Sequence, residues 1–309
     1  MSSAAPGSSA SIARSGSERR PALVGRRTRI GARVAEWPLV LPLALFFVAF
    51  FAAPLVVLAA VSFETAPGAA AFTLAHYAKF LGDGFNLSIL GDTLLLGAKA
   101  TLVCLVFGYP LAWITARASP KWQTALIFIT ILPILTSVVV RTFAWIVMLG
   151  RQGIINKALL GLGAIDEPIR LLFSETGVVI VLAQVQMPLM VLPILSTMAK
   201  IDPNLEDASA ALGAGRWRTF RRVLLPLSLP GVFAGCILVY ASSVTAFITQ
   251  TLIGGARLVY MPLAIYQQAL GANNWPLAAA MSMLFMAAVL LLVFLFGLIA
   301  RASRGEIHG

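Results

Sequence analysis

Six long apolar stretches constrain this chain more than any other feature of its sequence. A helix advances about 1.5 Å per residue, so about 20 apolar residues are needed to cross the hydrocarbon core of a bilayer. Each stretch reaches that length, and loops that contain Gly, Pro, Asn or charged residues separate them. The sequence therefore predicts an all-α, polytopic membrane protein with six transmembrane helices, at Leu39–Phe63, Ile89–Ala116, Trp122–Leu149, Gly177–Met198, Leu227–Ile253 and Leu277–Ala300.

The composition agrees with a membrane environment. Hydrophobic residues make up 59% of the 309 positions and charged residues only 11%, whereas a soluble domain has roughly 25% charged residues. The net charge of +11 comes from arginines in tails and loops, so we expect contact with membrane lipid and no nucleic acid partner. Residues 36–301 are expected to form the transmembrane domain, between a disordered basic cytoplasmic tail (1–35) and a short cytoplasmic tail (302–309).

The distribution of Lys and Arg predicts which side of the membrane is cytoplasmic. Most of the 23 basic residues fall on the side of the two termini if the chain crosses six times. Cytoplasmic loops carry the excess of Lys and Arg in membrane proteins. Both termini are therefore expected in the cytoplasm, and the basic residues left on the outer side are Lys79, Arg151, Lys157, Arg170 and Arg257.

Acidic and nucleophilic residues give no sign of chemistry within the spans. None of the 12 Asp and Glu residues lies deep in a span, and His76 and His308 lie outside them, so no proton relay is predicted. The sequence has no clustered carboxylates and histidines for a metal or an active site, and no Gly-x-x-x-x-Gly-Lys-Ser/Thr loop for ATP. We expect no enzyme activity, no metal and no cofactor in this chain. Uphill transport would need energy from a partner; the alternative is a secondary transporter of a small polar solute.

The loop between the fourth and fifth spans, residues 200–226, predicts a pair of short helices. Asp202 can cap the first helix, and Gly213 can supply the left-handed residue that ends it. Apolar residues recur at spacings of three and four in both helices, with arginines around the second. Two interpretations remain open: an amphipathic hairpin on the lipid surface, or a docking element for a soluble motor.

The same loop resembles the coupling loop of permease subunits in binding-protein-dependent ABC importers. Asp207-Ala208-Ser209, three residues, Gly213, nine residues and Val223-Leu224-Leu225-Pro226 keep the spacing of that family's Glu-Ala-Ala, Gly and Ile-x-Leu-Pro. The resemblance implies the type I permease fold of ABC importers and a coupling helix that sits in a cleft of an ATPase subunit. It assigns the coupling role to Glu206, Asp207, Ala208, Gly213, Val223, Leu225 and Pro226.

Motifs outside this loop are similar to those of spermidine/putrescine-type permeases. One departure is Thr249-Gln250, where many relatives have Thr-Pro. The resemblance implies a bacterial inner-membrane permease that forms half of the pathway for a polyamine-like solute. It also implies ABC ATPase subunits that bind ATP and Mg²⁺, and a periplasmic or lipid-anchored binding protein. The second permease subunit is expected to be a related but different chain, and a homodimer is the alternative. The motifs are Arg141–Asn156, Ile165–Pro168, Met187–Pro193, Leu252–Gly255, Ile265–Gln268 and Asn274–Pro276.

Polar side chains within the spans are candidates for the translocation pathway, because they would be costly against lipid. Ser242, Thr245 and Thr249 are spaced to share one face of the fifth span, and Gln184 lies in the fourth. Hydrogen bonding between helices is the alternative explanation for each of them.

Two further pathway candidates lie in the third span. Arg141 stands about 13 Å inside its outer end, and Trp145 follows one helical turn later. Arg141 is expected either to line the outer vestibule or to pair with a carbonyl or a carboxylate of a partner subunit. Trp145 can equally be an anchor at the membrane interface.

Overall fold

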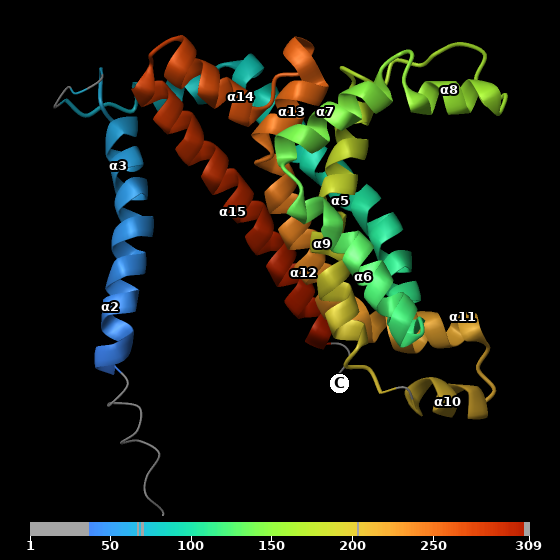
Figure 1. The fold of residues 1–309 in the computed structure, drawn as a ribbon. Coiled ribbons are helices and arrows are strands. Elements are labelled where there is room, and N and C mark those ends of the chain that lie inside the picture. Colours follow the sequence, from blue (N-terminus) through green and yellow to red (C-terminus); the bar gives the residue numbers. More distant parts are fainter. Residues whose placement is uncertain (1–36, 67, 69–70, 203, 306–309) are drawn as a thin grey trace, which may run out of the picture. The chain divides into compact units, whose positions relative to one another are not determined.

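The computed structural model describes residues 37–66, 68, 71–202 and 204–305, and the expected tail at 1–35 lies outside these ranges. Within them extended backbone pairs only at one isolated bridge, Glu64 with Phe72, so the all-α prediction is confirmed. The helices, in chain order, are α2 (Trp37–Phe47), η1 (Val48–Ala52), α3 (Ala53–Ser62), α4 (Ala75–Gly82), α5 (Gly84–Arg117), α6 (Pro120–Leu135), α7 (Val138–Leu149), α8 (Ile154–Gly161), α9 (Glu175–Met198), α10 (Asn204–Ala211), α11 (Arg216–Thr219), η2 (Phe220–Leu224), α12 (Leu225–Val244), α13 (Phe247–Gly254), η3 (Gly255–Arg257), α14 (Met261–Tyr266), η4 (Gln267–Gly271) and α15 (Trp275–Gly305) (Figure 1).

The chain divides into two units, Met1–Pro54 and Leu55–Gly309. In the first unit, the residues from Leu41 to Pro54 are exposed except Ala52, although nearly all of them are apolar. A helix that is apolar on every side needs lipid or another protein around it. The π-helical turn η1 ends two residues before Pro54, whose ring would clash with the carbonyl four residues earlier in a regular α-helix.

The second unit is built around three long helices, α5, α9 and α12, which pack against one another most extensively. Small residues allow the close approach of α12 to α9. A Cβ atom added to Gly231 would lie 2.6 Å from the carbonyl oxygen of Pro193, and one added to Gly235 would lie 2.9 Å from the sulfur of Met190. Close backbone contact through glycine is a common way to pack helices inside a membrane, where apolar burial itself gives little driving force.

Six helical runs in the described residues are long and apolar enough to cross a membrane, which confirms the predicted number. The first, second, fourth and sixth correspond closely to the predicted spans. The sixth continues as α15 to Gly305, so the expected domain boundary at residue 301 falls inside a helix. Figure 1 shows α8, α13 and α14 at one end of the second unit and α10 and α11 at the other, as alternating crossings require.

The third predicted span, Trp122–Leu149, is not one continuous helix. It consists of α6 and α7, separated by extended backbone at Thr136 and Ser137, with ψ of 146° and 133°. At 16 and 12 residues, the two helices are about 24 Å and 18 Å long, so neither crosses comfortably alone but the pair does. The run Val138–Gly161 is also long enough, but the turn at 150–153 divides it into α7 and α8.

The fifth predicted span, Leu227–Ile253, is also interrupted. Helix α12 ends at Val244, and Ala246, with ψ of 63°, turns the chain into α13. The side chain of Gln250 compensates for the interruption, because its Nε2 donates to the carbonyl oxygens of Ser243 at 2.8 Å and of Val244 at 3.2 Å. A buried amide in this place satisfies backbone acceptors that a continuous helix would have paired.

Candidate functional site

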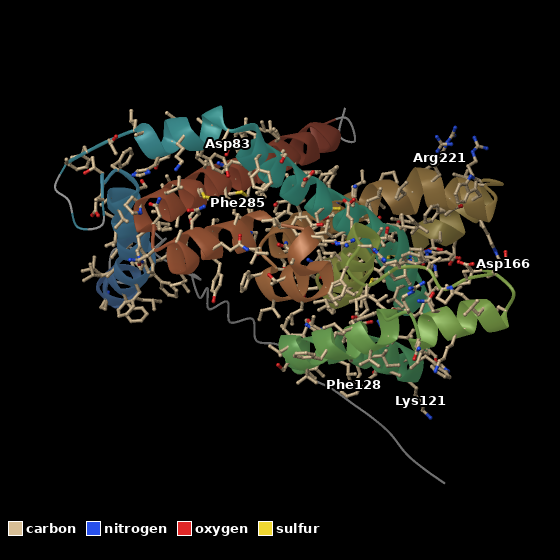
Figure 2. The ribbon with its side chains drawn as sticks, turned by 90° about the horizontal axis from the view of Figure 1, so that it is seen from above. Asp83, Lys121, Phe128, Asp166, Arg221 and Phe285 are labelled. Carbon is tan, nitrogen blue, oxygen red and sulfur yellow. The ribbon has the colours of Figure 1, made fainter. Side chains whose placement is uncertain are left out.

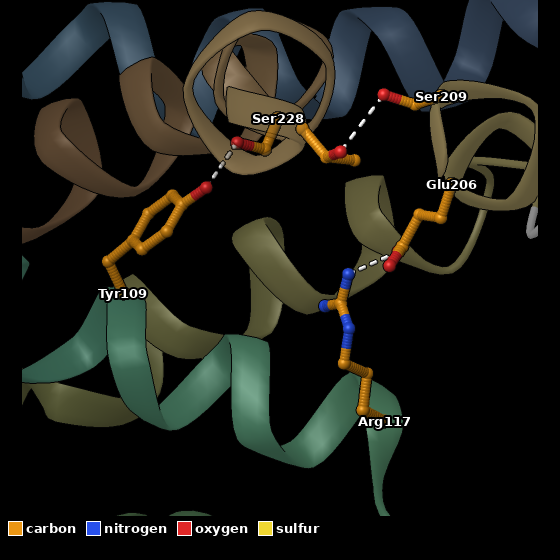
Figure 3. Close-up of polar contacts among 6 residues, drawn as sticks. Tyr109, Arg117, Glu206, Ser209 and Ser228 are labelled. Carbon is orange, nitrogen blue, oxygen red and sulfur yellow. Dashed lines mark hydrogen bonds and ion pairs between the residues drawn. The ribbon is translucent and has the colours of Figure 1, made fainter. Parts of the chain in front are cut away.

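The loop at 200–226 forms the predicted helical hairpin, named here the 200–226 hairpin. The side chain of Asp202 accepts from the N–H of Asn204 at 2.9 Å at the start of α10. Gly213, with φ of +77°, ends the helix as expected. The hydroxyl groups of Ser209 and Thr219 lie 2.9 Å apart and join α10 to α11 (Figure 3). The first short helix and both of its ends are as predicted. The second helix is not separate, because α11 continues through η2 into α12 and the fifth span therefore begins at Arg216.

An ion pair and a group of aromatic rings hold the hairpin against the end of α5. Arg117 of α5 pairs with Glu206 of α10 (Figure 3), and its guanidinium carbon lies 4.8 Å from the centroid of the Trp113 ring. The ring of Phe220 stacks on Trp217, with centroids 5.4 Å apart, and meets Trp113 edge to face at 6.0 Å. These contacts fix the orientation of the hairpin relative to the membrane-spanning core.

The predicted coupling residues divide into three groups. Glu206 points inward to Arg117, a partner that the sequence reasoning did not identify, and Asp207 beside it lines the cavity between the hairpin and α5. Ala208 and Gly213 are exposed and do not line that cavity. The other three belong to the connection into the core, since Val223 lies in η2 and Leu225 and Pro226 begin α12.

The outward surface of the hairpin is partly apolar. Leu212 is 89% exposed, and Leu205 on α10 is also exposed. Figure 2 shows Arg221 directed away from the helices at the edge of the hairpin. Between the hairpin and α5 lies a cavity of about 780 Å³, lined by the aromatic residues and by both partners of the Arg117–Glu206 ion pair. Contiguous exposed apolar surface of this kind marks a contact site for another protein or for a membrane.

Hydrogen bonds connect the predicted pathway residues to α9. The indole N–H of Trp145 on α7 donates to the Oε1 atom of Gln184 at 3.1 Å. On a different face of α9, the Nε2 atom of Gln186 donates to the hydroxyl of Ser242 on α12 at 2.6 Å. Polar side chains therefore connect α7, α9 and α12 in the interior of the second unit, which is the interhelical bonding that the sequence left as an alternative.

The expected shared face of Ser242, Thr245 and Thr249 does not exist, because the chain changes direction between α12 and α13. Thr245 is exposed and its hydroxyl donates to the carbonyl of Ala241 at 2.9 Å. Thr249 follows the break and is 2% exposed. Spacings of three and four residues put side chains on one face only within an uninterrupted helix. The prediction of a shared face was therefore wrong.

Arg141 lies in the first turn of α7, and its side chain reaches back across the break to α6. Its Nη1 group donates to the carbonyl oxygen of Pro133, which also accepts from the hydroxyl of Thr136 at 3.0 Å. Of the two alternatives for Arg141, pairing with a carbonyl is therefore observed. Its Nε atom is buried and makes no hydrogen bond within the described residues, so the guanidinium retains a donor that a second group could use.

Comparison with known proteins places this arrangement in a family. Residues 108–305 match the model of the binding-protein-dependent transport system inner membrane component. The chain belongs to this family. Its match covers the hairpin and the helices that surround it, and the family's transport permeases are not known to be enzymes.

Individual relatives extend the similarity to most of the chain. The spermidine/putrescine transport system permease protein PotB of Salmonella typhimurium is 37% identical over 75% of this chain and 80% of its own length. PotB of Escherichia coli K12 is 36% identical over 75% of this chain and 83% of its own length. One chain in the crystal structure of a bacterial alginate ABC transporter, in complex with its periplasmic protein, has a TM-score of 0.73 at 18% identity, covering 89% of this chain and 98% of that one. The chain is thus a multi-pass inner-membrane permease with the fold of ABC importer permeases.

Proposed function

We propose that this permease carries a polyamine, such as spermidine or putrescine, into the bacterial cytoplasm as one half of the translocation pathway of an ATP-driven importer. The identity of 36–37% to spermidine/putrescine permeases over three quarters of the chain supports this cargo. Aromatic and amide groups, such as Trp145 and Gln184, can contact an organic cation as it crosses. They do so without the high free-energy cost of placing a carboxylate within the membrane. A binding protein outside the membrane supplies the main recognition of the cargo.

The 200–226 hairpin docks on the ATPase subunit, and the observation that carries this proposal is its division into two surfaces. The inward surface is fixed to α5 through Glu206 and Arg117, whereas Ala208 and Leu212 are exposed and do not line the cavity between the hairpin and α5. A rigid element with a free surface can transmit a displacement of the ATPase to the spans. The shape of the hairpin and its connection to α12 are set by Gly213, Val223, Leu225 and Pro226. ATP and Mg²⁺ bind to the ATPase subunits.

A second permease subunit completes the pathway, because one core of this size cannot enclose a route between two ATPases. It is a related but different chain. We assign the inner surface of the pathway to the segment around Trp145, Gln184 and Ser242, with Thr245 exposed at the end of α12. Thr249 supports α13 from within, and Arg141 controls the joint between α6 and α7.

The orientation follows from the excess of Lys and Arg on the side of the 200–226 hairpin. Both termini then lie in the cytoplasm, next to anionic lipid, and α8 and α14 face outward. A secondary transporter is the second candidate, but it requires a proton or ion relay within the spans, and the sequence places no carboxylate deep inside them.

Co-purification and crosslinking test the proposal. The chain is expressed with its candidate ATPase, second permease and binding protein, and cysteine is introduced at Ala208 on the exposed side of α10. We expect a stoichiometric complex and a disulfide between Ala208→Cys and a cysteine in the ATPase cleft. The matched control is Thr219→Cys, which is buried on the other helix of the hairpin. Equal crosslinking of both positions, or purification of the chain without an ATPase, would contradict the docking surface.

A further inference from the structure

Three arginines meet at one pocket at the end of the second unit that lies opposite the 200–226 hairpin. Arg151, Arg170 and Arg257 line a cavity of about 550 Å³, together with the apolar side chains of Leu149 and Phe173 and their neighbours. The arginines come from three separate segments: the turn after α7, the connection that leads into α9, and η3. We call this site the arginine pocket.

A buried asparagine holds two of these segments together. Asn156 of α8 is fully buried, and its Nδ2 group donates to the carbonyl oxygens of Gly150 at 3.1 Å and of Ile169 at 3.0 Å. Its Oδ1 atom accepts from the N–H of Ile169 at 3.0 Å. Because each bonded backbone group lies next to an arginine in sequence, Asn156 fixes the position of Arg151 relative to Arg170.

A second contact joins the connection to α13 and η3. The N–H of Phe173 donates to the carbonyl oxygen of Ile253 at 2.9 Å. Phe173 has a φ of 60°, an uncommon conformation for a large side chain, and its ring lies against Gly255, where an added Cβ would approach it to 2.5 Å. The pocket is therefore a preorganised structure that brings Arg257 close to the other two arginines.

No ion pair within the described residues involves the arginines of the pocket. The two ion pairs found there are Lys99–Glu175 and Arg117–Glu206. Asp166 and Glu167 precede Arg170 in the same connection but pair with none of the arginines. The outer side has only five basic residues by the predicted orientation, so gathering three of them at one pocket creates a local field that favours an anion.

We propose that the arginine pocket receives acidic side chains of the extracytoplasmic binding protein. This inference rests on the proposed function, which puts the pocket on the outer side and supplies that partner. A polyamine cargo carries positive charge and would be repelled, so the pocket is not a stop for the cargo itself. Guanidinium groups bind carboxylates through paired hydrogen bonds, and the apolar wall formed by Leu149 and Phe173 suits the carbon stem of an Asp or Glu side chain.

The position of the pocket allows docking to be communicated to the pathway. Leu149 and Leu171 at the pocket belong to a buried cluster that also contains Ile253 of α13 and Leu182 of α9. The Phe173–Ile253 hydrogen bond gives a direct backbone connection to α13. A binding protein that docks at the pocket therefore exerts force on α9 and α13, which border the polar interior.

The test measures how the binding protein stimulates ATP hydrolysis by the full complex in nanodiscs of phosphatidylcholine, which has no net charge. Loaded binding protein is titrated against the parent and against the triple variant Arg151→Gln, Arg170→Gln and Arg257→Gln. We expect the concentration for half-maximal stimulation to rise about tenfold or more, with a weaker dependence on salt, because exposed charge pairs are screened by ions. Basal hydrolysis should be unchanged.

Two matched variants make the outcome interpretable. Lys79→Gln combined with Lys157→Gln removes outer charges that do not line the pocket and should leave the titration as in the parent. The triple replacement of the three arginines by lysine keeps the charge and should recover part of the response. An unchanged titration and salt dependence in the glutamine variant would overturn the proposal, as would an equal effect of the control. If the parent itself does not respond to any binding protein, the proposed function fails instead.

Discussion

Replacing Gly213 with valine is expected to uncouple the 200–226 hairpin from the ATPase without preventing membrane insertion. Gly213 ends α10 with φ of +77°, and its N–H donates to the carbonyl of Ala210 at 2.9 Å. This turn sets the direction in which α10 presents its exposed residues. Insertion should be normal because the residue lies outside every span.

The magnitude follows from the space around this glycine. A Cβ atom added to Gly213 would meet nothing within 4 Å, so the cost of a side chain is conformational and not steric. A residue other than glycine in the left-handed region costs roughly 1–2 kcal/mol, and a β-branched side chain lies at the upper end. The ratio of the native turn to its alternatives should therefore fall by roughly 5- to 30-fold.

Two further variants separate this explanation from a general loss of glycine. Gly215 lies two residues later, also has open space around it, and has φ of −69° and ψ of 159°, which any residue adopts. Gly215→Val should therefore behave like the parent chain. Gly213→Asn should be milder than Gly213→Val, because asparagine tolerates the left-handed conformation.

The assay measures co-purification of the ATPase and its stimulation by loaded binding protein. We expect at least about a fivefold loss of stimulation in Gly213→Val, with the chain still present in the membrane at the parent level. Full stimulation of Gly213→Val would refute the reasoning. A loss of the same size in Gly215→Val would refute it as well, since the effect would then not depend on φ.

Three other predictions concern the polar contacts of the core. Gln250→Leu removes the donor to two carbonyls at the end of α12 and should destabilise the chain by about 1–3 kcal/mol. The loss is measured as a lower midpoint of thermal unfolding in detergent, and Gln267→Leu, at an exposed position, should leave that midpoint unchanged. Arg141→Met should assemble with the ATPase and keep basal hydrolysis but lose stimulation by the loaded binding protein, and transport at the parent rate would reassign Arg141 to packing. Arg117→Glu and Glu206→Arg should each weaken coupling, and the double variant should recover part of it; strict additivity in the double-mutant cycle would show that the pair does not interact.

The long apolar runs and the 200–226 hairpin could be predicted from the sequence, because both depend on local information. Span length follows from hydropathy, and the ends of α10 follow from the capping residue Asp202 and from Gly213. The spacing from Asp207 to Pro226 then identified the hairpin with a known family. Each of these signals lies within a short segment, so no knowledge of tertiary contacts was needed.

The interruptions of the third and fifth spans could not be predicted in the same way. Both lie within apolar sequence, and both are stabilised by a side chain from beyond the break: Arg141 bonds back to Pro133, and Gln250 bonds back to Ser243. Gln250 stands where many relatives have proline, but the sequence does not show the two carbonyl groups to which its amide donates. Spacing along a continuous helix therefore misplaced Thr245 relative to Thr249.

The partners of the charged residues were also beyond the sequence. Glu206 is predicted to act in coupling, but Arg117 lies 89 positions earlier in the chain. The sequence does not show that the two side chains meet at the end of α5. The arginine pocket likewise combines three segments that only the fold brings together. Long-range pairs of this kind depend on how the helices pack.

The most direct test of the account is ATP-driven uptake of radiolabelled putrescine or spermidine into proteoliposomes. The vesicles contain this chain, its second permease and the ATPase, with loaded binding protein on the side opposite the ATPase. The account predicts accumulation that requires both ATP and the binding protein and that falls by about fivefold or more in Gly213→Val but not in Gly215→Val. Accumulation that proceeds without ATP under an ion gradient alone would contradict it.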